Sequence, residues 1–89
     1  MAYLYIRHTV SDFNKWYNSF KLSLGTYEDI GLTEIQLFQD KKDYNDVIMI
    51  FKVDDIEKTK SFLFAPEKEL ANEEAGVIGE PETIFLEKL

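Results

Sequence analysis

The hydrophobic positions in the first third of the chain predict a strand followed by an amphipathic helix. Residues 3–9 are aromatic and β-branched, which is typical of a strand. Ser11 offers a side-chain N-cap for the next element, Asp12 suits the positive end of a helix, and Gly31 is a natural stop. The apolar stripe recurs at helical spacing and consists of Phe13, Trp16, Tyr17, Phe20, Leu24 and Tyr27. The pattern therefore predicts one helix between Ser11 and Gly31.

The middle of the chain predicts a hairpin and the start of a second helix. Residues 32–39 favour a strand, and the polar residues 40–46 predict a turn long enough for a hairpin loop. Residues 47–53 are apolar on both faces, which suits a central strand covered on both sides. Asp54 and Glu57 have the spacing of a capping box, so we expect a helix to begin there.

The last third predicts two helices and a closing strand. The helix that begins after Asp54 extends to about Phe64, because Pro66 suits the first turn of a new helix better than the interior of an old one. A third helix at residues 67–75 leads to a last strand at residues 83–86. The order of elements predicts an α+β, ferredoxin-like βαββαβ fold, in which a four-stranded antiparallel sheet has its helices on one face.

The predicted strands carry more apolar side chains than one face of the sheet can use. Helices would cover one face only, so a monomer would expose a larger apolar patch than soluble monomers usually tolerate. A homodimer that pairs the two sheets, with twofold symmetry as the default, buries this surface. We place Tyr5, Arg7 and Phe51 at the dimer interface. Arg7 would form an ion pair there, and a clamp on a carboxylate or phosphate is the alternative.

Composition and charge exclude several classes of protein. Ten basic residues against seventeen acidic ones give a net charge of −7, so the chain lacks the basic surface that nucleic acids and anionic membranes require. The absence of cysteine excludes disulfides, thiolate zinc sites and iron–sulfur clusters. No apolar run is long enough to span a membrane, and the first residues do not resemble a secretory signal. We therefore expect one cytoplasmic domain spanning residues 1–89, with no membrane segment.

His8 is the candidate catalytic residue. It is the only histidine, and its ordinary pKa near neutrality suits a general base or a proton shuttle. Strand alternation places it on the face of Leu4 and Ile6, which we expect to point toward the helices. The alternative is a histidine at a strand end that bonds to a neighbouring loop.

Large apolar side chains supply a candidate pocket for an aromatic ligand. The same side chains at helical spacing are also typical of an ordinary core, so both interpretations stay open. We interpret the acidic pairs as caps and solvated surface, and we expect neither a metal site nor a cofactor. The candidate pocket residues are Trp16, Tyr17, Phe20, Phe38 and Met49.

Several short segments resemble a known superfamily. They are YIRHTV at 5–10, DFNKW at 12–16, LF at 37–38, VDDIEK at 53–58, APE at 65–67, AGV at 75–77 and GEP at 79–81. Together they resemble the dimeric α/β-barrel proteins of the antibiotic biosynthesis monooxygenase superfamily, in particular short bacterial members, many of them called cyclase-like. The resemblance implies a homodimer with a small pocket between sheet and helices in each subunit.

The resemblance also implies two alternative functions. One is a cofactor-independent oxygenase or cyclase that acts on a small aromatic metabolite without a metal. The other is a non-catalytic small-molecule-binding or stress-related interaction protein on the same fold. The haem-degrading members of the superfamily ligate iron with a histidine in the second helical region, and residues 55–75 of this chain contain none. We therefore do not expect haem ligation of that kind.

Overall fold

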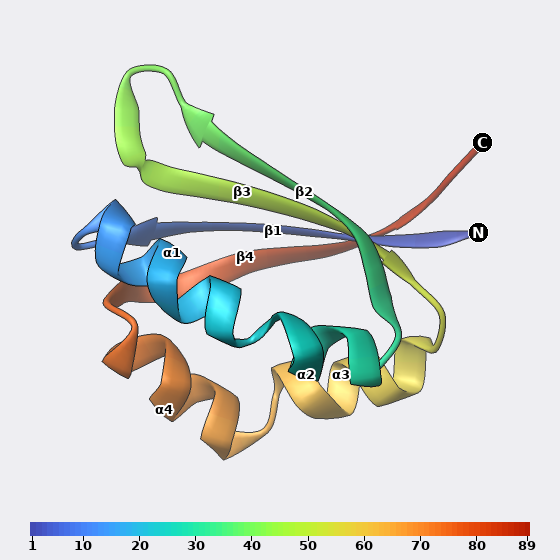
Figure 1. Ribbon diagram of the computed structural model, residues 1–89. Helices are drawn as coiled ribbons and strands as arrows, with labels where there is room; N and C mark the ends of the chain where they lie inside the picture. Colours follow the sequence, from blue (N-terminus) through green and yellow to red (C-terminus); the bar gives the residue numbers. More distant parts are fainter.

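The computed structural model describes all residues from Met1 to Leu89 as four strands and four helices (Figure 1). The strands lie above the helices in this view, and the two chain ends leave the sheet on the same side. The elements in chain order are β1 (Ala2–Val10), α1 (Phe13–Leu22), α2 (Leu24–Asp29), β2 (Leu32–Asp40), β3 (Asp43–Val53), α3 (Ile56–Leu63), α4 (Pro66–Glu74) and β4 (Val77–Glu87).

The sheet has the predicted ferredoxin-like topology. Its strand order is β2-β3-β1-β4, and every neighbouring pair is antiparallel. All helices lie on one side of the sheet, so the other face is open (Figure 1). The predicted α+β fold with helices on one face is therefore confirmed, and β1, which carries His8, lies in the interior of the sheet between β3 and β4.

Three details of the helices differ from the sequence prediction. The single helix expected between residues 11 and 31 is divided at Ser23 into α1 and α2. Asp12, and not Ser11, caps α1, since its carboxylate accepts from the backbone N–H groups of Asn14 and Lys15. The cap of α3 is Asp55, and Asp54 does not accept from the first turn. Asp12 and Asp55 each follow the residue that we expected as the cap, and both have the extended backbone of an N-cap. The sequence does not reveal this backbone conformation.

Two strands are longer than predicted. Strand β3 begins at Asp43, so only Lys41 and Lys42 separate it from β2, and the turn expected over residues 40–46 is mostly strand. Strand β4 begins at Val77, where we expected a loop. Backbone pairing with a neighbouring strand explains both extensions, because polar side chains are tolerated wherever a strand faces solvent.

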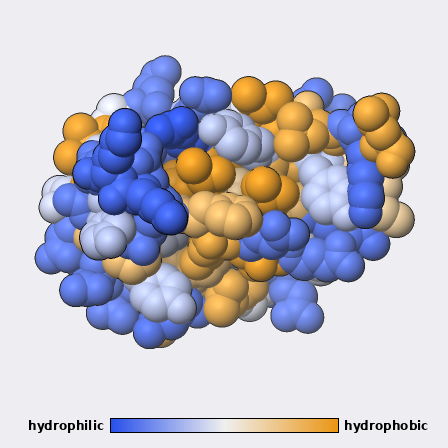
Figure 2. Space-filling model, turned by 90° about the horizontal axis from the view of Figure 1, so that it is seen from above, coloured by the Kyte–Doolittle hydropathy of each residue, from blue (hydrophilic) through white to orange (hydrophobic).

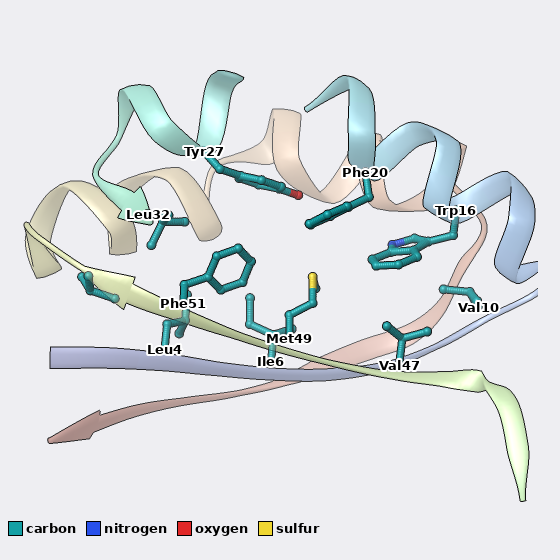
Figure 3. Close-up of a cluster of buried hydrophobic side chains, with 11 residues drawn as sticks. Leu4, Ile6, Val10, Trp16, Phe20, Tyr27, Leu32, Val47, Met49 and Phe51 are labelled. Carbon is teal, nitrogen blue, oxygen red and sulfur yellow. The ribbon is translucent and has the colours of Figure 1, made fainter. Parts of the chain in front are cut away.

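The core lies between the helices and the covered face of the sheet. Rings from α1 and α2 reach down to side chains of β1 and β3 (Figure 3). Each of these buried side chains removes apolar surface from water, which is the main stabilising contribution to the fold. The cluster comprises Leu4, Ile6, Val10, Trp16, Phe20, Tyr27, Leu32, Val47, Met49, Phe51 and Val53.

The open face of the sheet is also rich in apolar side chains. Figure 2 looks down on this face, and hydrophobic residues occupy its centre with polar residues around them. The cross-strand register aligns Tyr3 with Leu86, Tyr5 with Ile50 and Ile84, and Phe38 with Ile48. Four apolar side chains of these strands are substantially exposed, namely Phe38, Ile78, Ile84 and Leu86.

Phe51 does not belong to this open face. Its side chain is 1% exposed and lies in the core beside Tyr27, at a ring distance of 5.6 Å. The placement of Phe51 at a dimer interface was therefore wrong. Residues two apart in a strand share a face, so Phe51 lies with Met49 on the covered side, whereas Ile48 and Ile50 occupy the open side.

Candidate functional site

A cavity of about 340 Å³ lies between the covered face of the sheet and helices α3 and α4. Its floor comes from β1 and β3, with Ile6, His8, Met49 and Phe51. Trp16 and Tyr27 form its wall on the side of α1 and α2, while α4 and the first part of β4 surround the remainder. A volume of this size lies at the small end of the range for small-molecule sites.

His8 is a polar group in the floor of the cavity. Its side chain is 6% exposed, and its Nε2 atom is buried without a hydrogen-bond partner. The imidazole meets the Trp16 ring edge to face at 5.3 Å between ring centres. Burial, reinforced by the positive charge of Lys68, lowers the pKa of His8 to about 4. At neutral pH the cavity therefore contains an uncharged imidazole with one unpaired nitrogen.

A bulge in β4 lies next to His8. Arg7 pairs with Glu82 and Thr9 pairs with Ile78, so β4 has two more residues than β1 across this interval. His8 is opposite Val47 of β3 but has no partner on β4. The three residues of β4 in this interval, Gly79, Glu80 and Pro81, line the cavity instead. The irregular pairing therefore lies beside the imidazole, and bulges are common near functional sites.

Lys68 and Tyr27 form a polar contact on the cavity wall. The Lys68 ammonium donates a hydrogen bond to the Tyr27 hydroxyl, with 3.2 Å between Nζ and Oη. The same ammonium lies over the rings of Tyr27 and Phe62, at 5.2 and 5.4 Å from their centres. Sequence reasoning missed Lys68, since nothing distinguishes it from the other lysines, and it took Tyr27 only as part of the helical stripe.

The structure brings some of the predicted pocket residues together and separates others. Trp16 and Met49 line the cavity with His8. Phe20 is buried beside Trp16, at 5.2 Å between ring centres, but belongs to the core next to the cavity. Tyr17 is 37% exposed on α1, and Phe38 is on the open face of the sheet. Neither Tyr17 nor Phe38 lines the cavity.

Arg7 is on the opposite face of β1 from His8. Its guanidinium donates to both carboxylate oxygens of Asp46 and approaches Asp40, so it forms an ion-pair cluster at the hairpin end of the open face. The hydrogen bonds from Arg7 lower the pKa of Asp46, and Asp46 in turn raises the pKa of Arg7. Arg7 is therefore already paired with carboxylates, as the ion-pair interpretation expected.

No group of three or more His, Asp or Glu side chains is arranged to hold a metal ion. No helix has the length and apolarity that a membrane crossing needs.

Comparison with known proteins gives similarity at the level of structure. No protein-family profile matches the sequence, and no curated protein is detectably similar to it. Among solved structures, an antibiotic biosynthesis monooxygenase superposes with a TM-score of 0.72 at 14% identity, covering 100% of this chain and 99% of the other. SnoaB, a cofactor-independent oxygenase from Streptomyces nogalater, gives a TM-score of 0.72 at 14% identity, with coverage of 99% and 94%.

The same fold occurs in a conserved protein from Methanosarcina mazei, for which the TM-score is 0.74 at 11% identity with coverage of 99% and 92%. Identities this low establish shared architecture, and one fold can host unrelated activities. The similarity extends over the full length of the chain. The chain therefore has the fold of the antibiotic biosynthesis monooxygenases, as the short sequence segments implied.

Proposed function

We propose that this protein is a cofactor-independent oxygenase of a small aromatic compound. The observation that carries the proposal is the partly open cavity in which aromatic side chains lie together with an uncharged His8 whose Nε2 atom has no partner. The structural similarity to SnoaB, itself a cofactor-independent oxygenase, supports the reaction class. An oxidation of this type is the addition of one oxygen atom from O₂ at a ring carbon that bears two hydrogens, with the second oxygen atom leaving as water.

The cavity favours a flat apolar ligand. Trp16, Tyr27 and Phe51 supply ring surfaces, and Ile6 and Met49 fill the space between them. Aromatic rings stack or meet edge to face, so such walls orient a planar ligand as well as hold it. The volume of about 340 Å³ suits a compact ring system of a few rings and excludes an extended polyketide chain.

His8 would act as the proton acceptor. A neutral imidazole with an unpaired nitrogen accepts a proton from an acidic hydroxyl or an activated ring carbon, which leaves the electron-rich anion that reacts with O₂. Because the pKa of His8 is low, its protonated form is unfavourable by itself. The newly formed negative charge on the substrate would stabilise this protonated imidazole. In this scheme the apolar walls exclude water from the anion, which limits its reprotonation.

The proposed reaction is tested with anthrone under ¹⁸O₂. Oxygen uptake with a naphthalene hydroquinone, which is oxidised to the quinone while O₂ is reduced to hydrogen peroxide, tests oxidation of a second aromatic compound. We expect turnover above the spontaneous oxidation and one labelled oxygen in the anthrone product. His8→Gln should lower the rate about 10²–10⁴-fold, because the proton acceptor is lost. Tyr44→Phe, on the exposed hairpin away from the cavity, is the matched control and should retain full activity. An unchanged rate in His8→Gln would remove His8 from the mechanism.

We also propose that the active form is a homodimer joined through the open faces of the two sheets. The apolar centre of that face is flanked by the Arg7 cluster, and both Tyr5 and Arg7 lie on it, as a sheet-to-sheet interface requires. Burial against a second copy removes from water a surface that is otherwise unusual for a monomer. The cavity is on the other face of each sheet, so each subunit would hold its own ligand.

One observation favours a second candidate function, the non-catalytic binding of an aromatic small molecule. Among the titratable side chains in the cavity lining, only His8 and Tyr27 are buried, and no other catalytic group hydrogen-bonds to the free nitrogen of His8. A protein that binds aromatic ligands tightly, yet turns over neither hydroquinone nor anthrone, would fulfil this second function.

A further inference from the structure

Lys68 carries a positive charge at the cavity that no carboxylate neutralises. The ion pairs of the chain involve the N-terminal ammonium, Arg7 and Lys60, and none includes Lys68. The side chain is half-buried, and its only hydrogen bond is to the Tyr27 hydroxyl. In a chain with a net charge of −7, an unpaired cation held against a ligand-sized cavity is a distinctive feature.

The field of this charge reaches the cavity floor. Lys68 contributes to the depressed pKa of His8, so the two groups interact although they come from α4 and β1. The rings of Tyr27 and Phe62 hold the ammonium by cation–π contact and limit its freedom to turn into solvent. An anionic group on a ligand would therefore meet a partly desolvated and positioned cation, where a charge-assisted hydrogen bond is stronger than at the surface.

Three carboxylates also line the cavity. Glu69, Glu73 and Glu80 are exposed, and none of them pairs with Lys68. Their negative charges oppose the approach of a multiply charged anion, since like charges raise the free energy of binding. A ligand with one negative charge gains the contact with Lys68 and meets the least repulsion.

We propose that the cavity selects an aromatic ligand with a single anionic oxygen group, a carboxylate or a phenolate, bound by the Lys68 ammonium and the Tyr27 hydroxyl. This inference rests on the proposed function, because it adds the charge of the aromatic ligand that the cavity would hold. Both partners donate hydrogen bonds, so an anionic oxygen accepts from both. The aromatic body of the ligand would then lie toward Trp16 and the neutral His8.

The test compares an anion with its uncharged analogue. 2-Naphthoate and 2-naphthamide are nearly equal in shape, and 1-naphthyl phosphate adds a dianion. Binding is followed through Trp16, which is the only tryptophan and lines the cavity. We expect 2-naphthoate to bind at least about tenfold more tightly than 2-naphthamide at pH 7 and low salt, which corresponds to about 1.4 kcal/mol. The phosphate should bind less tightly than the carboxylate.

Two lysine variants separate the local contact from general charge. Lys68→Gln should abolish the preference for 2-naphthoate over 2-naphthamide. Lys60→Gln, which removes an equal charge on α3 outside the cavity lining, should retain the preference. Thermal melting of each variant checks that the fold is intact.

The remaining outcomes distinguish this inference from the function on which it rests. Equal binding of acid and amide to the wild type, or a preference that survives in Lys68→Gln, would overturn the role of Lys68 and leave an aromatic cavity in place. If neither compound binds at millimolar concentration, the aromatic cavity itself is refuted, and the proposed function falls with it.

Discussion

At the scale of single residues, His8 shows how burial changes the chemistry of a side chain. An exposed histidine gains a proton near pH 6.5, whereas His8 stays neutral down to about pH 4 because its surroundings do not solvate the charge. Two charged groups from other elements also act on the pKa of His8. Lys68 of α4 opposes protonation, and Asp46 of β3 favours it. The neutral form that the proposed reaction needs is therefore maintained over the whole physiological range.

The depressed pKa of His8 makes stability depend on pH. Between pH 6.5 and pH 4 the unfolded chain binds a proton that the native protein does not, so the free energy of unfolding falls as the pH is lowered. We expect wild type to lose about 2 kcal/mol relative to His8→Gln between pH 7.5 and pH 5. Urea titrations of both proteins at the two pH values measure this difference. A constant difference would show that His8 titrates normally.

At the scale of elements, the loop between β1 and α1 is tied to the loop between α4 and β4. The backbone N–H of Ser11 donates to the carbonyl of Gly76, with 2.8 Å between N and O. Gly76 has a φ of +86°, and a Cβ built on it would lie 2.6 Å from the Ser11 hydroxyl oxygen. This position therefore combines a left-handed backbone with close packing, and only glycine satisfies both.

Two glycine variants test this contact. Gly76→Ala should destabilise the protein by about 1–3 kcal/mol, because it adds backbone strain to a steric clash. Gly25→Ala is the matched control, since Gly25 is helical and has open space around it, and it should stabilise the protein by about 0.5 kcal/mol. Chemical denaturation measures both changes. Equal effects of the two substitutions would contradict the strained geometry at Gly76.

The sequence was sufficient for the topology and for part of the site. Periodicity placed Trp16 on the apolar stripe of its helix and His8 on the helix-facing side of its strand, because spacing along a helix and alternation along a strand are local properties. It favoured Asp54 as the cap of α3, whereas Asp55 is the cap, because both have the right side chain and the sequence does not reveal the backbone conformation. The contact of Lys68 with Tyr27 joins residues 41 positions apart, and no local pattern encodes it.

At the scale of the whole molecule, the open sheet face determines assembly. We expect wild type to sediment at twice 10.4 kDa at micromolar concentration. Ile50→Lys places a charge in the middle of the apolar face and should yield a monomer, because a buried unpaired charge is costly. Leu22→Lys, on the helical side at a residue that is 88% exposed, should leave the dimer intact. A monomeric wild type would refute sheet-to-sheet pairing.

Helix α4 differs from the rest of the molecule in how it is held. None of its residues is buried, although it supplies Lys68 and Asn72 to the cavity lining. Because α4 contributes no buried residue, we expect it to open at a lower free energy than that of unfolding the sheet. The lifetime of a ligand in this cavity would then depend on the release of α4. The residence time of the ligand and the free energy of unfolding would vary independently. Substitutions in α4 could lengthen the residence time without changing the free energy of unfolding.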